Sequence, residues 1–165
     1  MRALFLSFML SLAICFDSFA LDLCAICPGG MLAEDVPGAV ADYVADWMTY
    51  DSHMERGSRQ YEFNIALNEG RGVCVGYSLL FCDILRHIPI DEYGVVNYHT
   101  LSPLYYCCTV ICNDFHAWSA VLSKDGWLWY DITFYDNSEF DRLPEYAPMS
   151  SKEMRDGWHG APRIY

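Results

Sequence analysis

The chain is poor in positive charge. Its 165 residues include 10 Lys and Arg against 22 Asp and Glu, which gives a formal net charge of −12. Nucleic acid and anionic membrane surfaces are therefore poor partners, because both repel an acidic protein. The net negative charge does not come from residues 1–20, since the charges of Arg2 and Asp17 cancel in that segment.

A hydrophobic run long enough to span a bilayer is also missing at the amino terminus. The apolar stretch from Leu4 to Cys15 is too short for that role. It follows Arg2 and precedes Ser18-Phe19-Ala20, an arrangement typical of a secretory signal peptide cleaved after Ala20. We therefore expect residues 1–20 to be a signal peptide. The mature protein would be secreted or periplasmic, with no stable membrane insertion after cleavage.

The sequence lacks internal repeats, low-complexity tracts and any break in composition that would divide it into two domains. A chain of this length can bury one core, and its 53% hydrophobic residues favour a folded protein. Residues 21–35 are rich in Cys, Pro and Gly and are interpreted as an irregular lead-in. Residues 36–165 are expected to form the domain, and nothing predicts its oligomeric state.

Cysteine, in contrast, is abundant, with eight residues in the chain. Cys15 would leave with the signal peptide, and the remaining number is odd. If Cys74 stays free, the other six can form disulfides whose pairing the sequence leaves open. These six are Cys24, Cys27, Cys82, Cys107, Cys108 and Cys112.

Two other uses of the cysteines are less favoured. Cys24-Ala-Ile-Cys27 could be a redox pair or half a metal site, but no βαβ pattern surrounds it, so a structural bridge is preferred. Cys107, Cys108, Cys112 and His116 could bind zinc, although adjacent cysteines suit a tetrahedral site poorly. No metal and no cofactor are expected.

Hydrophobic periodicity and turn residues predict an α+β protein. We expect helices over residues 36–50 and 61–67, and a longer helix that starts near Cys74 and ends before Pro89. Strands are predicted over 93–97, 115–122 and 127–134, the last two joined as a hairpin by the turn at 123–126. Residues 98–113 are interpreted as irregular, and a short helix is possible over 151–158.

Cys74 follows the structure-breaking Gly70 and Gly72 and precedes the apolar helix, so it is predicted in the first helical turn. Unpaired backbone N–H groups and the positive end of the helix dipole stabilise a thiolate there. The same N–H groups can stabilise an oxyanion. A nucleophile at this position still needs a base, and the base needs a group that orients it.

The predicted hairpin offers both groups. His116 lies near the start of the first strand and Asp131 near the middle of the second, so the two could be cross-strand neighbours. A bulge at Asp125-Gly126 could set that register, whereas a two-residue Asp-Gly turn would leave the two several residues out of step. Trp118 would share the strand face of His116 and shield the imidazole from water. Singly, each residue is more often a buried thiol or a surface polar group, but the ordered set favours catalysis.

Two blocks resemble the transglutaminase-like superfamily. "GVCVGYSLLFCDILRHIPI" is similar to its nucleophile helix, and "FHAWSAVLSKDGWLWYDITFYDN" to its His-Ala-Trp strand, glycine turn and Asp-x-Thr strand. The tail "MSSKEMRDGWH" is also similar to bacterial-type members, and the resemblance covers roughly residues 36–136. It implies a papain-like α+β fold, with the nucleophile helix packed on a small antiparallel sheet. Cys74, His116 and Asp131 would be nucleophile, base and orienting group.

The resemblance has departures. His87 replaces the family's glycine before Ile-Pro, and the stretch from His99 to Asn113, with its three cysteines, is not a usual family feature. No Gln lies at the papain-like spacing before Cys74. Gln60, Tyr61 and Asn64 are the candidates for an oxyanion side chain.

The sequence therefore predicts a secreted thiol enzyme that acts on amide bonds of a protein or peptide substrate through a thioester. Hydrolysis, as in a cysteine protease or amidase, is preferred to transglutaminase cross-linking, because transfer to an amine requires a cleft that disfavours water. The alternative is a non-catalytic, disulfide-stapled secreted module that binds protein or cell-wall ligands. A disulfide oxidoreductase using Cys24 and Cys27 is a third possibility.

Overall fold

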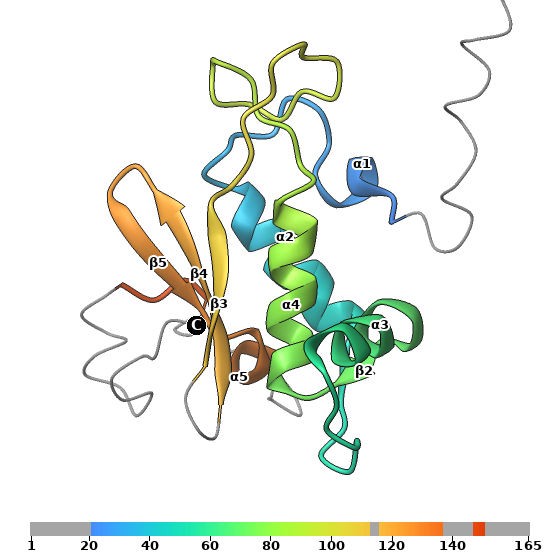
Figure 1. Ribbon diagram of the computed structural model, residues 1–165. Coiled ribbons are helices and arrows are strands. Elements are labelled where there is room, and N and C mark those ends of the chain that lie inside the picture. The colour runs from blue at the N-terminus through green and yellow to red at the C-terminus, as the bar shows by residue number, and fades with distance from the viewer. Residues whose placement is uncertain (1–20, 113–115, 137–146, 151–165) are drawn as a thin grey trace, which may run out of the picture.

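A computed structural model describes residues 21–112, 116–136 and 147–150, and confirms the α+β prediction (Figure 1). Helices pack on one face of a three-stranded antiparallel sheet. The predicted signal peptide and the helix predicted over 151–158 lie outside the described residues. The elements are α1 (Leu23–Ile26), α2 (Val36–Trp47), β1 (Thr49–Tyr50), α3 (Arg59–Glu69), β2 (Arg71–Gly72), α4 (Cys74–Leu85), β3 (Cys108–Cys112), β4 (Ala117–Ser123), β5 (Gly126–Tyr130) and α5 (Ile132–Asp136).

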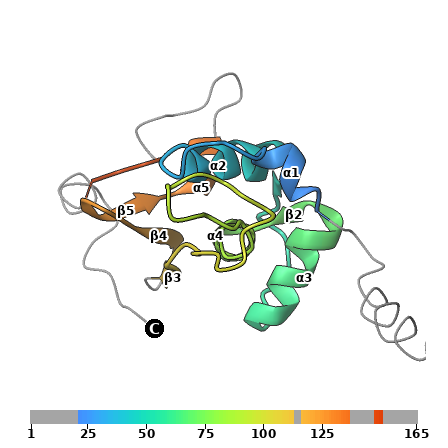
Figure 2. The same cartoon turned by 90° about the horizontal axis from the view of Figure 1, so that it is seen from above.

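Helix α4 forms the centre of the core. It lies between the sheet on one side and α2 on the other, as the view from above shows (Figure 2). Its residues are buried around most of its circumference, which is typical of a helix covered by neighbours on all sides. Tyr77, Leu80 and Phe81 are among its fully buried side chains. No helix in the described ranges is both long and apolar enough to cross a membrane.

The three-stranded sheet has the order β3-β4-β5, and the predicted hairpin of β4 and β5 is confirmed. Ser123 pairs with Gly126, so the connecting turn has two residues, Lys124 and Asp125. The third strand, β3, falls in the stretch that the sequence indicated as irregular. Cys108, Val110 and Ile111 are buried and the other two residues are half-buried, so the strand lacks the alternation that identifies a half-exposed strand.

Three predicted elements need correction. The helix predicted over 36–50 ends at Trp47, because the next residues form β1. The strand predicted over 93–97 is a turn with isolated bridges, since the Asp91 carboxylate accepts hydrogen bonds from the N–H groups of Tyr93 and Val95. The strand predicted over 127–134 ends at Tyr130, and the chain then turns into α5.

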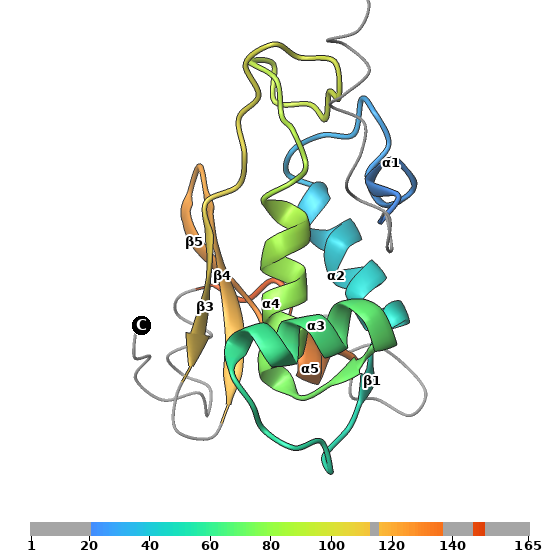
Figure 3. The same cartoon turned by 45° about the vertical axis from the view of Figure 1, so that its right-hand side comes forward.

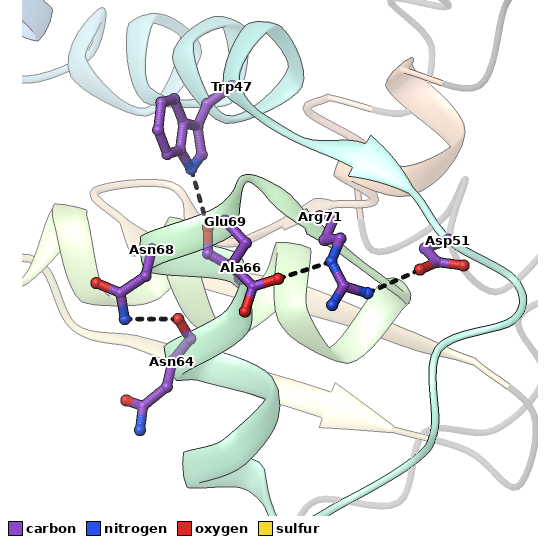
Figure 4. Close-up of polar contacts among 7 residues, drawn as sticks. All are labelled: Trp47, Asp51, Asn64, Ala66, Asn68, Glu69 and Arg71. Atoms are coloured by element: carbon purple, nitrogen blue, oxygen red, sulfur yellow. Dashed lines mark hydrogen bonds and ion pairs between the residues drawn. The ribbon is translucent and has the colours of Figure 1, made fainter.

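A polar network fixes the chain that leads into α4 (Figure 4). The indole N–H of Trp47 donates to the Ala66 carbonyl at 2.9 Å, which joins α2 to α3. The Arg71 guanidinium donates to Glu69 at 2.8 Å and to Asp51 at 2.9 Å. Because Arg71 lies in β2, these contacts hold β1 and β2 together directly before the first residue of α4.

Gly70 allows the end of α3 to lie directly against the Trp47 carbonyl of α2. It ends α3 in the left-handed conformation, with φ of 61°. A Cβ atom at this position would lie 2.7 Å from the Trp47 carbonyl oxygen, which is too close for any side chain. Gly94 shares the positive φ, at 76°, but a Cβ atom there meets nothing within 4 Å.

We therefore expect Gly70→Ala to destabilise the protein more than the matched control Gly94→Ala. Both variants place an alanine in the left-handed region, at a cost of about 1–2 kcal/mol. Gly70→Ala adds the clash with the Trp47 carbonyl, worth roughly 1–3 kcal/mol more. Urea unfolding of both variants measures the difference, and equal free energies of unfolding would contradict the close approach at Gly70.

Candidate active site

Cys74 is the first residue of α4, which confirms its predicted place in the first helical turn. The N-cap residue, Val73, makes no side-chain cap. The helix start packs closely on α3, since a Cβ atom on Gly76 would lie 3.4 Å from the Cβ atom of Ala66. Cys74 is present as a free thiol, is 2% exposed, and belongs to the main hydrophobic cluster. Tertiary packing thus fixes where this sulfur lies.

His116 and Asp131 are joined by a short hydrogen bond. The distance between His116 Nε2 and Asp131 Oδ2 is 2.6 Å, and the side chains are 10% and 0% exposed. The other oxygen of Asp131 accepts the backbone N–H of Phe134 at 3.2 Å, and so supports the first turn of α5. One buried carboxylate therefore both starts a helix and orients the imidazole.

The register of the hairpin explains how the two residues meet. Ser119 pairs with Tyr130, and the same register carried further places Thr133 opposite His116. Asp131 is thus a diagonal neighbour of His116, because the turn consists of Lys124 and Asp125 and not of the Asp125-Gly126 pair that the sequence suggested. They meet because His116 lies just before β4 and Asp131 just after β5, where the two chains are no longer paired as strands. Asp131 is consequently not in the middle of a strand.

Aromatic rings enclose the imidazole. The ring of Trp118 stacks on that of His116, with centroids 6.0 Å apart and planes inclined at 27°. Phe134 meets the imidazole edge-on at 5.0 Å. Trp118 is fully buried and in contact with the imidazole, which is consistent with the shielding role that the sequence predicted. This low-dielectric surrounding strengthens the interactions of the imidazole with its polar neighbours.

The pKa of His116 is raised from 6.5 to about 9. Burial lowers this pKa, but hydrogen bonds of the ring to Asp131 and to Cys74 outweigh that effect, aided by both negative charges. The structure thus brings His116 into a hydrogen bond with Asp131 and close enough to Cys74 for that residue to raise the pKa of the imidazole. Because Asp131 occupies Nε2, the second ring nitrogen, Nδ1, is the one left for the sulfur.

The sequence did not indicate several neighbours of this group. Cys112 ends β3 and pairs with Ala117, the residue after His116. Burial raises the pKa of the Cys112 thiol, and the charge of Arg59 opposes that effect. Farther along α4, the Tyr77 hydroxyl donates to Asp136 at 3.0 Å. Recognition of β3 as a buried strand would have placed Cys112 beside the hairpin.

The side chains suggested for an oxyanion site lie on the exposed side of α3. The Gln60 amide donates to Asn64 at 2.9 Å, and Tyr61 is exposed as well. The opposite side of α3, with the buried Glu62 and Ala66, is the one that contacts α4. The geometry therefore favours the backbone N–H groups at the start of α4 over these side chains.

A cavity of about 780 Å³ lies away from the three candidate catalytic residues. Its walls come from the tip of the hairpin, the lead-in and the loop before β3, and include Leu32, Tyr106 and Leu128. Cys74 and His116 are not among its lining residues. Within the same described ranges, no group of three or more His, Cys, Asp or Glu side chains is placed to hold a metal ion.

Comparison with known proteins matches the chain to one family. A family model described as Transglutaminase-like superfamily matches residues 31–132, a range that includes Cys74, His116 and Asp131. A solved structure titled "Crystal structure of a TGase" is 19% identical, with a TM-score of 0.44. The match covers 72% of this chain and 30% of that one. The search of curated proteins found no match.

The raised pKa of His116 predicts how the free energy of unfolding depends on pH. The folded state holds a proton that the unfolded state releases near pH 6.5, so the stabilisation is complete below pH 6.5 and is lost as the pH rises through about 9. Asp131→Asn should reduce this loss, because it removes the charge that retains the proton. Urea unfolding between pH 6 and 10 measures both profiles.

Asp125→Asn is the matched control, because Asp125 lies at the exposed tip of the same hairpin. Its pH profile should follow that of the unmodified protein. If Asp131→Asn and the unmodified protein lose the same stability over this range, the His116–Asp131 hydrogen bond does not control the proton.

Proposed function

The chain belongs to the transglutaminase-like superfamily, and on this premise we propose that it is a secreted thiol enzyme acting on amide bonds of proteins or peptides. The observation that supports the proposal most directly is the buried His116 ring, which is hydrogen-bonded to Asp131 at 2.6 Å and whose pKa is raised by both Asp131 and Cys74. A nucleophile, a base and a group that orients the base are the minimum set for thiol catalysis. Export is proposed from the signal-peptide pattern alone.

In the proposed reaction, Nδ1 of His116 accepts the proton of Cys74, and the sulfur attacks the amide carbonyl carbon. The raised pKa of His116 favours the state in which the imidazolium already holds this proton and stabilises the attacking sulfur. Backbone N–H groups at the start of α4 stabilise the oxyanion. The imidazolium then returns the proton to the departing amine, which leaves a thioester on Cys74. Asp131 keeps the Nε2 proton in place and stabilises the imidazolium.

Water is the proposed acceptor for the thioester. Transfer to a lysine amine requires a cleft that keeps water from the thioester. The cavity at the hairpin tip does not border Cys74, so it does not supply such a cleft. Hydrolysis, with His116 taking the proton of the attacking water, is therefore preferred to cross-linking.

One observation favours the non-catalytic alternative. Cys74 is only 2% exposed, and buried structural cysteines are usually inert. In that case the same fold would serve to bind a protein or cell-wall ligand. The two functions differ in the reactivity of a single thiol, which can be measured directly.

Alkylation by iodoacetamide at about pH 6, followed by mass spectrometry of the peptides, is the first test. We expect Cys74 to react faster than the exposed Cys24 and Cys107, because the imidazole removes its proton. His116→Ala should slow the alkylation of Cys74 by about tenfold or more. His87→Ala, at the exposed far end of α4, should leave it unchanged.

The outcome that would overturn the enzyme proposal is a Cys74 that reacts no faster than Cys107 and does not respond to His116→Ala. That result would leave the binding module as the better reading. Retention of fold in each variant is checked by circular dichroism, so that loss of reactivity is not confused with unfolding.

The acceptor is tested with a glutamine-containing protein and a fluorescent primary amine. Hydrolysis predicts release of ammonia, with little fluorescence incorporated into the protein. Cys74→Ala should abolish both products, and Asp131→Asn should reduce turnover by roughly a hundredfold or more, because the imidazole loses its fixed tautomer. Cys107→Ser is the matched control and should remain active. Predominant incorporation of the amine would instead assign transglutaminase activity.

A further inference from the structure

Two cysteines outside the candidate active site lie together in the core. Cys82 is on α4, about two turns after Cys74, and Cys108 is the first residue of β3. Their exposed fractions are 0% and 7%. The Cys108 thiol donates to the Cys82 carbonyl oxygen at 3.3 Å, and both cysteines are free thiols in this structure. This contact joins residues 26 positions apart in the sequence.

Arg86 lies beside this pair and favours its chemistry. Its guanidinium donates to the Cys108 carbonyl at 2.6 Å. The hydrogen bond from Cys82 and the charge of Arg86 lower the pKa of the Cys108 thiol, while the pKa of Cys82 is raised well above its usual value. Of the two, Cys108 is thus the sulfur that attacks first and Cys82 the one that follows.

The neighbouring cysteines are placed differently. Cys107 directly precedes Cys108 but is exposed, because successive residues of an extended chain point to opposite sides. Cys112 lies at the other end of β3, next to Arg59. Cys24 and Cys27 are near Tyr98, whose hydroxyl donates to the Cys27 carbonyl. The placement of these residues leaves Cys82 as the partner that faces Cys108.

We propose that Cys82 and Cys108 form a disulfide that ties α4 to β3. The oxidant is a disulfide of a thiol exchange partner, either a protein or oxidised glutathione. The Cys108 thiolate attacks one sulfur of that disulfide and releases the other as a thiolate. Cys82 then loses its proton as it attacks the Cys108 sulfur and releases the second thiolate. The two thiol protons pass to the released thiolates, so two cysteines are oxidised and one disulfide is reduced to two thiols.

This link would join the two parts of the candidate site without touching it. Helix α4 begins with Cys74, and β3 pairs with β4, which directly follows His116. A covalent bond between α4 and β3 therefore limits how far the sulfur and the imidazole can move apart. The proposal does not rest on catalysis, because the same link would stabilise a non-catalytic module.

The test uses the full chain, equilibrated with oxidised and reduced glutathione, alkylated under denaturing conditions and digested without reduction. Trypsin cuts after Arg86, so the disulfide appears as a link between a peptide containing Cys82 and a peptide containing Cys108. Fragmentation of the linked peptides assigns the sulfurs, because Cys74 shares the first peptide and Cys107 and Cys112 share the second. The expected result is a Cys82–Cys108 bond, with Cys74 alkylated.

Cys108→Ser should remove the link, and the matched control Cys107→Ser, one residue away and exposed, should retain it. The unmodified protein should also lose several degrees of melting temperature on reduction, whereas Cys108→Ser should show no such loss. Recovery of Cys82 and Cys108 as alkylated thiols from the oxidised protein would overturn the proposal. So would a link that persists in Cys108→Ser. Mapping of the unmodified protein decides the question even where a variant does not fold.

Discussion

The hydrogen bonds of the buried Asp131 carboxylate are the interaction on which the rest of the site depends. A carboxylate removed from water is costly unless each oxygen has a partner. Asp131 has the imidazole of His116 on one oxygen and the N–H of Phe134 on the other. The first contact draws the chain before β4 towards the chain after β5, and the second starts α5. The path of the chain at the end of the hairpin is therefore set by the hydrogen bonds that the buried Asp131 carboxylate needs.

The same reasoning connects the hairpin to the core. Helix α4 is buried between the sheet and α2, so its position is set by apolar packing over its whole length (Figure 3). Cys74 is its first residue, and its location is therefore a consequence of core packing and of the Arg71 network that precedes it. A site assembled in this way has its sulfur on one rigid element and its imidazole on another. Their relative position depends on how α4 packs on β3 and β4.

The sequence predicted the features that local chemistry determines. Glycines followed by an apolar helical pattern indicated that Cys74 would start a helix, and the turn before Trp127 indicated the hairpin. It placed Asp131 inside a strand because the aromatic and β-branched residues around it favour strands. In the structure Asp131 instead supports the first turn of α5, and that capping role outweighs strand propensity. Only the fold shows whether such a residue continues a ladder or ends it.

Burial conceals other elements from sequence analysis. The segment Cys108 to Cys112 is a strand covered on both sides, so hydrophobic alternation, the usual signal, is weak there. Residues 93–97 have good strand formers, yet the Asp91 carboxylate binds two of their N–H groups and Gly94 takes a positive φ. In β3 and in residues 93–97 alike, the structure depends on burial or hydrogen bonds that the hydrophobic pattern of the segment itself does not show. The missed strand is also the one that carries Cys108 and Cys112.

Burial of Cys74 is compatible with reactivity because of what surrounds it. A thiol enclosed by hydrocarbon alone is inert, since nothing stabilises its charge. Cys74 has apolar packing on one side and on the other the His116 ring, which carries a positive charge below its pKa of about 9. Exclusion of water strengthens this electrostatic contact, because the effective dielectric constant is lower than in solvent. The enclosure that makes the sulfur hard to reach is thus also what makes the imidazole effective, and a substrate needs access to one side of the sulfur only.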